Sequence, residues 1–279
     1  MLALGKLGGR EPNYHSDLDV IFLYDVSSAF EASLKDDTGS QFFFSELAAG
    51  ITRSITQSTT RGRLFELDSR LRPTGKSGSL AVSMDEFLRY FRTGKGHLWE
   101  RQSLCKARVV FGGSGVSAKA KAVVKQALLM KPWDDSMALE IKAMRLAMQK
   151  DATDENIKRG VGGTVDIEFA VQMLQLKHVE DDPSVWTPGT VDAINRLVES
   201  GKLDEELGSS LSNSYQFLRS VESRLRLMNT AARHDLPTQQ KQLQKLAYML
   251  KYPDAQSLTQ AVDKCRAQVR ADFERVVSG

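Results

Sequence analysis

Residues 16–24 carry the most regular strand pattern in the chain. From position 20 onward both faces of an extended chain are apolar, with Ile21 and Leu23 on one face and Val20, Phe22 and Tyr24 on the other. A strand that is apolar on both faces is buried on both. We therefore predict that this segment is a central strand of a sheet.

The pattern predicts further elements on both sides of a glycine-rich run at residues 112–115. Before this run we expect a helix over 40–58, a strand over 63–72 that carries Asp68, a short strand over 79–82, and helices over 84–92 and 97–106. After it, three- and four-residue apolar spacing predicts helices over 136–150, 164–179, 189–199, 204–230, 238–248 and 255–277. We expect an α+β domain over residues 1–112 and an all-helical bundle domain over 113–279. Because the chain opens directly on an expected strand, we also expect it to be a fragment of a longer polypeptide or to begin at a late start site.

Composition narrows the class of protein. The chain has 279 residues, of which 41% are hydrophobic and 26% charged, as in soluble globular proteins. A net charge of +3 suits anionic ligands without requiring nucleic acid. Cys105 and Cys265 lack metal-type spacing, which favours reduced thiols and a cytoplasmic location. No apolar run reaches the roughly 18 residues of a membrane span, and we expect no signal peptide.

The first half of the strand pattern carries two aspartates. Asp17 and Asp19 point the same way because side chains in a strand alternate. Two adjacent carboxylates repel each other unless a cation lies between them, and Mg²⁺ prefers oxygen ligands of this kind. The glycines at 5, 8 and 9 would leave backbone amides open to a phosphate. This arrangement indicates metal-dependent nucleotidyl transfer; the alternative is a glycine hairpin that enters a strand with a solvent-facing acidic end.

Basic residues offer several phosphate contacts, each with a plain structural alternative. Lys6 lies in the glycine turn, and Arg70 and Arg72 would share a strand face before a Pro-Thr-Gly turn. These arginines are either triphosphate ligands or surface residues. Lys106 and Arg108 are either nucleotide contacts or cations at a helix end.

Four ordered motifs resemble those of the glutamine synthetase adenylyltransferase family. They are Gly5-Lys6-Leu7-Gly8-Gly9-Arg10-Glu11 with Ser16-Asp17-Leu18-Asp19; Leu67 to Pro73 with Ser77-Gly78; Leu98 to Gln102 with Lys106 to Val110; and Lys158 with Gly162-Gly163 and Asp166 to Phe169. Together they run from residue 2 to about residue 170, and the helical remainder fits the layout of the family.

The resemblance implies a fold, a substrate and a set of site residues. It implies a polymerase-beta-like nucleotidyltransferase domain with a mixed sheet, followed by the helical bundle. Two Mg²⁺ ions would be held by Asp17 and Asp19. Asp68 is the favoured third ligand, and Glu66 is its alternative. The competing interpretation is that Asp68 is a surface aspartate paired with Arg70. The residues expected to contact ATP are Lys6, Gly8, Gly9, Ser16, Arg70 and Arg72. Gly8-Gly9 stands where the superfamily usually has Gly-Ser, so no hydroxyl is available there to contact a phosphate. Asp166 and Glu168 are expected to support the cleft without taking part in the chemistry.

The family has one half that adds AMP to a tyrosine of glutamine synthetase and another that removes it with phosphate. Tyr24-Asp25 and residues 98–102 are more similar to the adenylylating, C-terminal half. The resemblance implies glutamine synthetase as partner and the PII signal protein as a further candidate partner. The alternatives are the deadenylylating half, transfer to a small acceptor or a nucleic-acid end, and a non-catalytic nucleotide-binding regulatory module.

Overall fold

The computed structural model describes residues 1–26, 39–58, 60, 62, 65–228 and 234–278. The chain forms two compact units: the first consists of Met1–Pro12 and Ser16–Pro132, and the second of Asn13–His15 and Trp133–Gly279. None of the helices that the structure describes has the length and apolar character that crossing a membrane requires.

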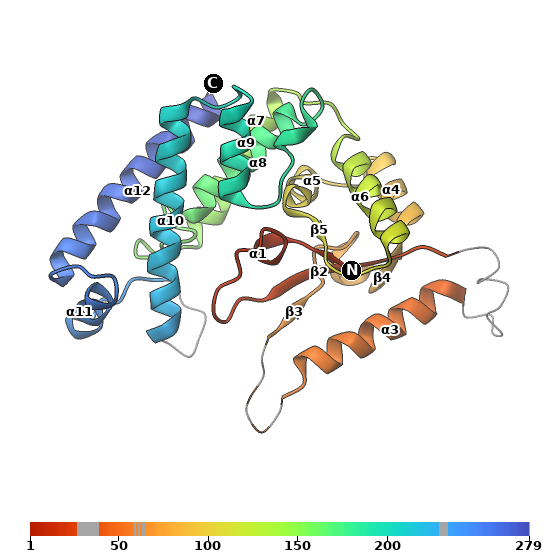
Figure 1. The fold of residues 1–279 in the computed structure, drawn as a ribbon, viewed down its shortest axis with the longest axis horizontal. Coiled ribbons are helices and arrows are strands. Elements are labelled where there is room, and N and C mark those ends of the chain that lie inside the picture. Colours follow the sequence, from red (N-terminus) through yellow and green to blue (C-terminus); the bar gives the residue numbers. More distant parts are fainter. Residues whose placement is uncertain (27–38, 59, 61, 63–64, 229–233, 279) are drawn as a thin grey trace. The chain divides into compact units, whose positions relative to one another are not determined.

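The first unit is built around a mixed sheet (Figure 1). Its strands are β1 (Leu2–Ala3), β2 (Leu18–Tyr24), β3 (Leu67–Asp68), β4 (Ala81–Ser83) and β5 (Arg108–Val109). They run in the order β3-β2-β1-β5, and β4 also pairs with β2. β1 is antiparallel to β2 and β5, whereas β3 and β4 are parallel to β2. The expected α+β class with a mixed sheet and a central strand is confirmed.

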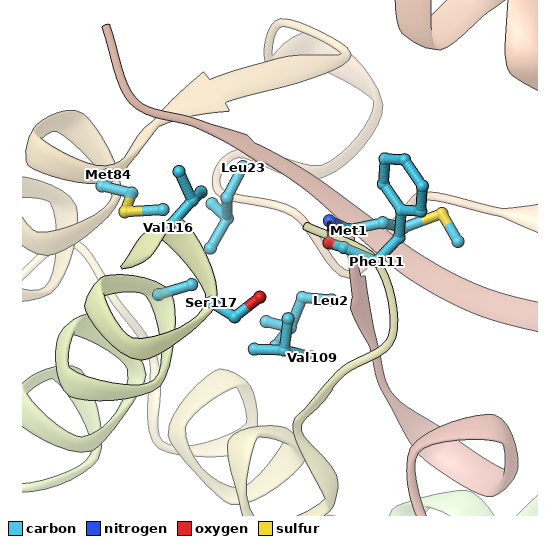
Figure 2. Close-up of a pocket in the computed structure, with 9 residues that line it drawn as sticks. Met1, Leu2, Leu23, Met84, Val109, Phe111, Val116 and Ser117 are labelled. Carbon is cyan, nitrogen blue, oxygen red and sulfur yellow. Dashed lines mark hydrogen bonds between the residues drawn. The ribbon is translucent and has the colours of Figure 1, made fainter. Parts of the chain in front are cut away.

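The two faces of β2 are covered by different helices. Val20, Phe22 and Tyr24 form a buried cluster with Ala48 of α3 (Gly39–Thr56), and Tyr24 stacks on Phe44 at 4.5 Å between ring centroids. On the other face, Leu23 lines a small apolar pocket with Met84 of α4 (Met84–Arg92) and Val116 of α6 (Ser114–Leu128), as Figure 2 shows. The apolar alternation read from residues 20–24 thus corresponds to two separate packing layers.

Four expectations about the first unit differ from the structure. The predicted strand over 63–72 is limited to Leu67–Asp68 among its described residues, and positions 63 and 64 lie outside them. The strand expected at 79–82 is β4, shifted to Ala81–Ser83, and the helix expected over 97–106 is α5 (Leu98–Ser103) followed by a 3₁₀ turn, Leu104–Lys106. The glycine run at 112–115 leads directly into α6, which packs on α4, so the compact units divide at Pro132 rather than at residue 112.

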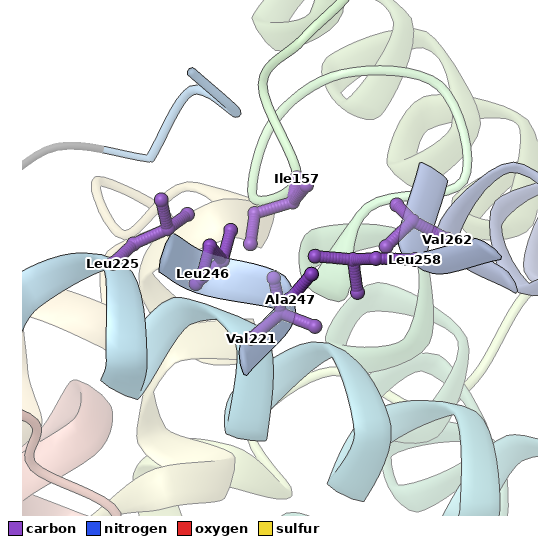
Figure 3. Packing of buried hydrophobic residues seen from close by; sticks show 7 residues of the cluster. All are labelled: Ile157, Val221, Leu225, Leu246, Ala247, Leu258 and Val262. Atoms are coloured by element: carbon purple, nitrogen blue, oxygen red, sulfur yellow. The ribbon is translucent and has the colours of Figure 1, made fainter. Parts of the chain in front are cut away.

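The second unit is helical. It contains α7 (Ser136–Lys150), α8 (Thr164–His178), α9 (Thr190–Glu199), α10 (Glu205–Met228), α11 (Gln240–Met249) and α12 (Ala255–Ser278). Figure 3 shows one of its buried clusters, in which Val221 and Leu225 of α10 pack against Leu246 of α11 and Leu258 and Val262 of α12. The helices predicted here agree with the structure to within a few residues; the predicted end of the 204–230 helix lies outside the described residues.

Candidate active site

Strand register brings two of the predicted carboxylates together. β2 and β3 are parallel, with Leu18 paired to Leu67 and Asp19 paired to Asp68. Residues paired across neighbouring strands extend their side chains from the same face of the sheet, so Asp19 and Asp68 are neighbours. Asp17 comes just before β2, two positions from Asp19, and its side chain is exposed. The three predicted acidic residues therefore share one end of the central strand.

The glycine turn lies directly against one of these carboxylates. It forms a single helical turn, α1 (Gly5–Gly8), and the amide of Leu4 before it donates to the carbonyl oxygen of Asp19 at 2.9 Å. Gly5 has φ +49°, and a Cβ at this position would lie 2.3 Å from Oδ2 of Asp19. A side chain at residue 5 would displace the carboxylate, so only glycine permits this contact. The sequence placed Gly5 in the glycine turn but gave expected ATP contacts only to Gly8 and Gly9; the contact of Gly5 with Asp19 is seen only in the structure.

Two cations from a distant segment hold this turn. Arg108 donates from Nε to the carbonyl oxygen of Gly8 and from Nη2 to that of Leu7, both at 2.8 Å. Lys106, which is buried, pairs with Glu11 at 2.7 Å. A Cβ on Gly8 would lie 1.8 Å from the carbonyl oxygen of Lys106, which shows how closely the segments approach. Arg108 is thus a helix-end cation, as one interpretation of the sequence held, but the helix is α1 rather than its own.

The amides of the glycine pair are already engaged. Gly8 N–H donates to Leu4 O at 2.8 Å and Gly9 N–H to Gly5 O at 3.2 Å. This differs from the expectation that these amides are open to a phosphate. Lys6 is half-buried within α1, and Ser16 is buried just before Asp17.

Arg70 grips Asp68. Its Nε lies 2.9 Å from Oδ1 and 2.8 Å from Oδ2, its Nη2 also contacts Oδ2, and its backbone amide donates to Oδ1 at 2.8 Å. These hydrogen bonds from Arg70 hold the pKa of Asp68 below its usual range, against the opposing effect of burial. The guanidinium also interacts electrostatically with Asp17 and Asp19. Arg70 therefore binds Asp68 directly and acts on Asp17 and Asp19 through its charge.

Arg72 has a different environment from Arg70. It is buried, and its guanidinium donates to Ser69 O at 2.7 Å and to Gly78 O at 3.1 and 3.2 Å. Burial lowers its pKa. The two arginines were expected on one strand face, but both follow the end of β3, and Arg72 ties together the loop over residues 69–78. With α4 this loop lines a polar pocket of about 330 Å³.

The donor set suits a divalent cation. Three carboxylates lie at one end of β2, and hard cations such as Mg²⁺ prefer carboxylate oxygens. Among the residues that the structure describes, however, no three such side chains are already arranged as a metal cage. Asp68 is instead hydrogen-bonded to Arg70, whose guanidinium also interacts electrostatically with Asp17 and Asp19. Asp17, Asp19 and Asp68 thus provide the type and number of oxygen ligands that a divalent metal needs, but Asp68 is hydrogen-bonded to Arg70.

The acidic motif of the second unit is structural. Asp166 at the start of α8 is fully buried, contacts Nε of Arg145 and accepts a hydrogen bond from Gly162 N–H at 2.9 Å. Arg145 also donates to Gly160 O at 2.7 Å, and Arg270 lies 3.8 Å from Asp166. Burial raises the pKa of Asp166, and Arg145 opposes this shift. The ion pair fixes the glycine loop at residues 160–163.

Glu168, the other acidic residue of this motif, accepts a hydrogen bond from the hydroxyl of Tyr215 at 3.1 Å. Sequence reasoning did not identify Arg145, because no local pattern links it to a loop that begins fifteen residues later.

Comparison with known proteins matches the two parts of the chain to two different family models. Residues 1–123 match the family described as glutamate-ammonia ligase adenylyltransferase, and residues 136–277 match that described as GlnD PII-uridylyltransferase. Proteins named bifunctional glutamine synthetase adenylyltransferase/adenylyl-removing enzyme align with nearly the whole chain. The protein of Aromatoleum aromaticum is 33% identical over 99% of this chain and 29% of its own length. The protein of Idiomarina loihiensis is 29% identical over 99% of this chain and 29% of its own length. The enzyme of Xanthomonas oryzae pv. oryzae is 31% identical over 100% of this chain and 30% of its own length. The chain thus spans about three tenths of the length of these relatives.

Proposed function

Because the chain belongs to the glutamine synthetase adenylyltransferase family, we propose that it transfers AMP from ATP to a tyrosine of glutamine synthetase in a metal-dependent reaction. In this proposal the first unit is a polymerase-beta-like nucleotidyltransferase domain. The observation that carries the proposal is the parallel register that pairs Asp19 with Asp68, together with the contact between Asp19 and Gly5. A carboxylate cluster against a glycine turn suits the binding of a metal-bound triphosphate.

The residues of the chain take distinct roles in the proposed reaction. Asp17, Asp19 and Asp68 would hold two Mg²⁺ ions, which when bound lower the pKa of the acceptor hydroxyl and neutralise charge on the leaving pyrophosphate. Arg70, with its exposed planar fork, suits the oxygens of the triphosphate. Lys6 and Ser16 are further nucleotide contacts in the proposal.

The proposed reaction is a single displacement. The tyrosine oxygen attacks the α-phosphorus of ATP, the bond from that phosphorus to the bridging oxygen breaks, and pyrophosphate leaves while the hydroxyl proton passes to solvent. Gly5 contributes by leaving room for the Asp19 carboxylate. Arg108 and Lys106 contribute by holding the turn that contains Gly5.

We assign the adenylylating direction from the similarity of Tyr24-Asp25 and of residues 98–110 to that half of the family. The names of the relatives also include adenylyl removal, so the reverse, phosphorolytic half is the second candidate. The metal-bound carboxylates would serve both directions, and the difference must lie in how the acceptor is positioned.

One preparation tests both directions. We expect it to transfer label from α-labelled ATP to glutamine synthetase with release of pyrophosphate, and to release little ADP from modified glutamine synthetase in the presence of phosphate. Dominant phosphorolysis would reverse the assigned direction and leave the site assignment standing. Nucleotide binding that is independent of metal, without transfer in either assay, would instead identify a regulatory module.

A further inference from the structure

Arg70 occupies the hydrogen-bonding positions of Asp68 that a metal would need. Its side chain contacts both carboxylate oxygens, and its backbone amide takes a further position on Oδ1. A Mg²⁺ ion binds carboxylate oxygen at about 2.0–2.1 Å in near-octahedral geometry. An Asp68 carboxylate engaged by the guanidinium fork cannot also present an oxygen to a metal at the same edge.

The guanidinium also supplies positive charge to the cluster as a whole. It interacts electrostatically with Asp17 and Asp19 as well as with Asp68, and Lys76 acts on Asp68 from the same loop. Without a cation, three neighbouring carboxylates would destabilise the fold through mutual repulsion. Arg70 therefore does electrostatically, in the metal-free chain, part of what a bound metal would do.

Arg70 can leave Asp68 at little cost. The Arg70 side chain is 62% exposed, so its rotation breaks no core packing, although the Asp68 side chain is only 15% exposed and gains from having a cation as partner. Arg72, two residues later, is held by carbonyl oxygens on several sides and lacks this freedom. The chain thus has one fixed and one movable guanidinium in the same loop.

We propose that Arg70 is an internal counter-ion that exchanges partners during substrate binding: it holds Asp68 in the metal-free chain and moves to the triphosphate when a divalent metal takes Asp68. This inference rests on the proposed function, because it assigns the three carboxylates to metal. Metal alone must displace Arg70 and leave it without its carboxylate. Metal together with nucleotide gives the guanidinium a new anionic partner, so each ligand strengthens the binding of the other.

The inference predicts a specific effect of Arg70→Gln on metal binding without nucleotide. Removing the competing cation frees Asp68, so we expect Mn²⁺, used as the probe in calorimetric titration, to bind about tenfold more tightly than to the unmodified chain. Addition of α,β-methylene-ATP should tighten Mn²⁺ binding in the unmodified chain but much less in Arg70→Gln. Arg70→Lys, which keeps the charge but lacks the fork, should fall between the two.

Two controls make the outcomes separable. Arg92→Gln removes an exposed arginine at the end of α4 and should leave Mn²⁺ affinity unchanged. Asp19→Asn reports whether Mn²⁺ binds at the carboxylates at all. If Mn²⁺ binding depends on Asp19 but is equal or weaker in Arg70→Gln and Arg70→Lys, the exchange is wrong and the proposed metal site stands. If no form of the chain binds Mn²⁺ in an Asp19-dependent way, the proposed function and this inference both fail.

Discussion

Each unit of the molecule contains a glycine turn beside buried or half-buried acidic residues, yet the two sites differ in charge balance and exposure. In the first unit, α1 lies against Asp19, which is paired with Asp68, and Arg70 is hydrogen-bonded to Asp68 and interacts electrostatically with Asp17 and Asp19. In the second unit the loop at 160–163 surrounds Asp166, a single carboxylate with guanidinium groups of Arg145 and Arg270 nearby. The first site has more negative than positive groups, and the second has the reverse.

This difference separates the proposed ligand site from a structural one. The buried pair of Arg145 and Asp166 has both charges matched inside the protein, so it needs no further ligand to be stable. The carboxylates of the first unit face solvent in part and are only partly matched by Arg70, so added positive charge should bind there. Glycine turns and acidic residues are common to both sites and do not distinguish them.

The strongest test of the comparison is removal of charge from the carboxylate pair. We expect Asp17→Asn or Asp19→Asn to reduce AMP transfer by at least roughly 10²–10³-fold, since each removes a proposed metal ligand. The melting temperature should stay equal or rise because repulsion between carboxylates is relieved. Transfer of label from α-labelled ATP and thermal melting measure the two effects. Glu46→Gln on the exposed side of α3 is the matched control, and full transfer by the Asp17→Asn/Asp19→Asn double variant would refute the assignment.

A second test concerns the third ligand. Asp68→Asn should reduce AMP transfer as strongly as Asp19→Asn, whereas Glu66→Gln should change it by less than about twofold. The reason is register: Asp68 is paired with Asp19, while Glu66 is exposed and contributes its carbonyl oxygen to Leu18 N–H at 2.8 Å. The same transfer assay on both variants is sufficient. If Glu66 is essential for transfer and Asp68 is dispensable, the third metal ligand is Glu66, two residues before the one assigned.

In the second unit the same type of substitution should affect stability. Asp166→Asn leaves Arg145 buried without its carboxylate, and we expect the free energy of unfolding to fall by about 3–5 kcal/mol. Urea denaturation followed by tryptophan fluorescence measures this, because Trp133 and Trp186 both lie in the second unit. Asp263→Asn, an exposed aspartate on α12, is the control. A stable Asp166→Asn variant without AMP transfer would instead indicate a catalytic role for Asp166.

The smallest expected effect is on the pH dependence of stability. Arg70 lowers the pKa of Asp68 from its ordinary value of 3.8, so the ionised pair stabilises the fold above that value and loses this effect as the pH falls through the lowered pKa. Arg70→Gln removes the contribution. The difference in free energy of unfolding between the unmodified chain and Arg70→Gln should therefore be present at pH 5–7 and shrink below pH 3.8. Urea denaturation across this range measures it, and a difference that grows on acidification would contradict the assigned pair.

Local patterns were sufficient to predict much of the fold. Val20, Phe22 and Tyr24 alternate with Ile21 and Leu23, and this alternation alone gave the central strand and its two packing layers. The helices α4 and α7 agree with the predicted bounds of 84–92 and 136–150 because each carries a regular apolar stripe. Such patterns depend only on neighbouring residues.

Features that depend on particular hydrogen-bond or packing partners, near or far in sequence, were not predictable in the same way. Asp68 lies in a strand of only two residues because the following turn is held by Arg72, whose acceptors include Gly78 O. The start of α6 follows a glycine run that is typical of a linker, and the burial of Val124 and Ala127 shows that tertiary packing stabilises the helix. Of the predicted site residues, the structure pairs Asp19 with Asp68, joins Arg70 to Asp68, leaves Asp17 exposed just before β2, and ties Arg72 into a loop.

The hydrogen bonds from Arg108 to the carbonyl oxygens of α1 have a consequence for the order in which the first unit folds. The hydrogen bond from Arg108 to Gly8 O joins residues 100 positions apart, and β1 pairs with β5 in the same region. Contacts of such sequence separation form late, since a long loop must close before they can stabilise anything. A nascent chain that has reached β4 already contains every proposed metal ligand but lacks the segment that fixes the glycine turn beside them. On the proposed function, we therefore expect nucleotide binding to require β5 as well as the proposed metal ligands.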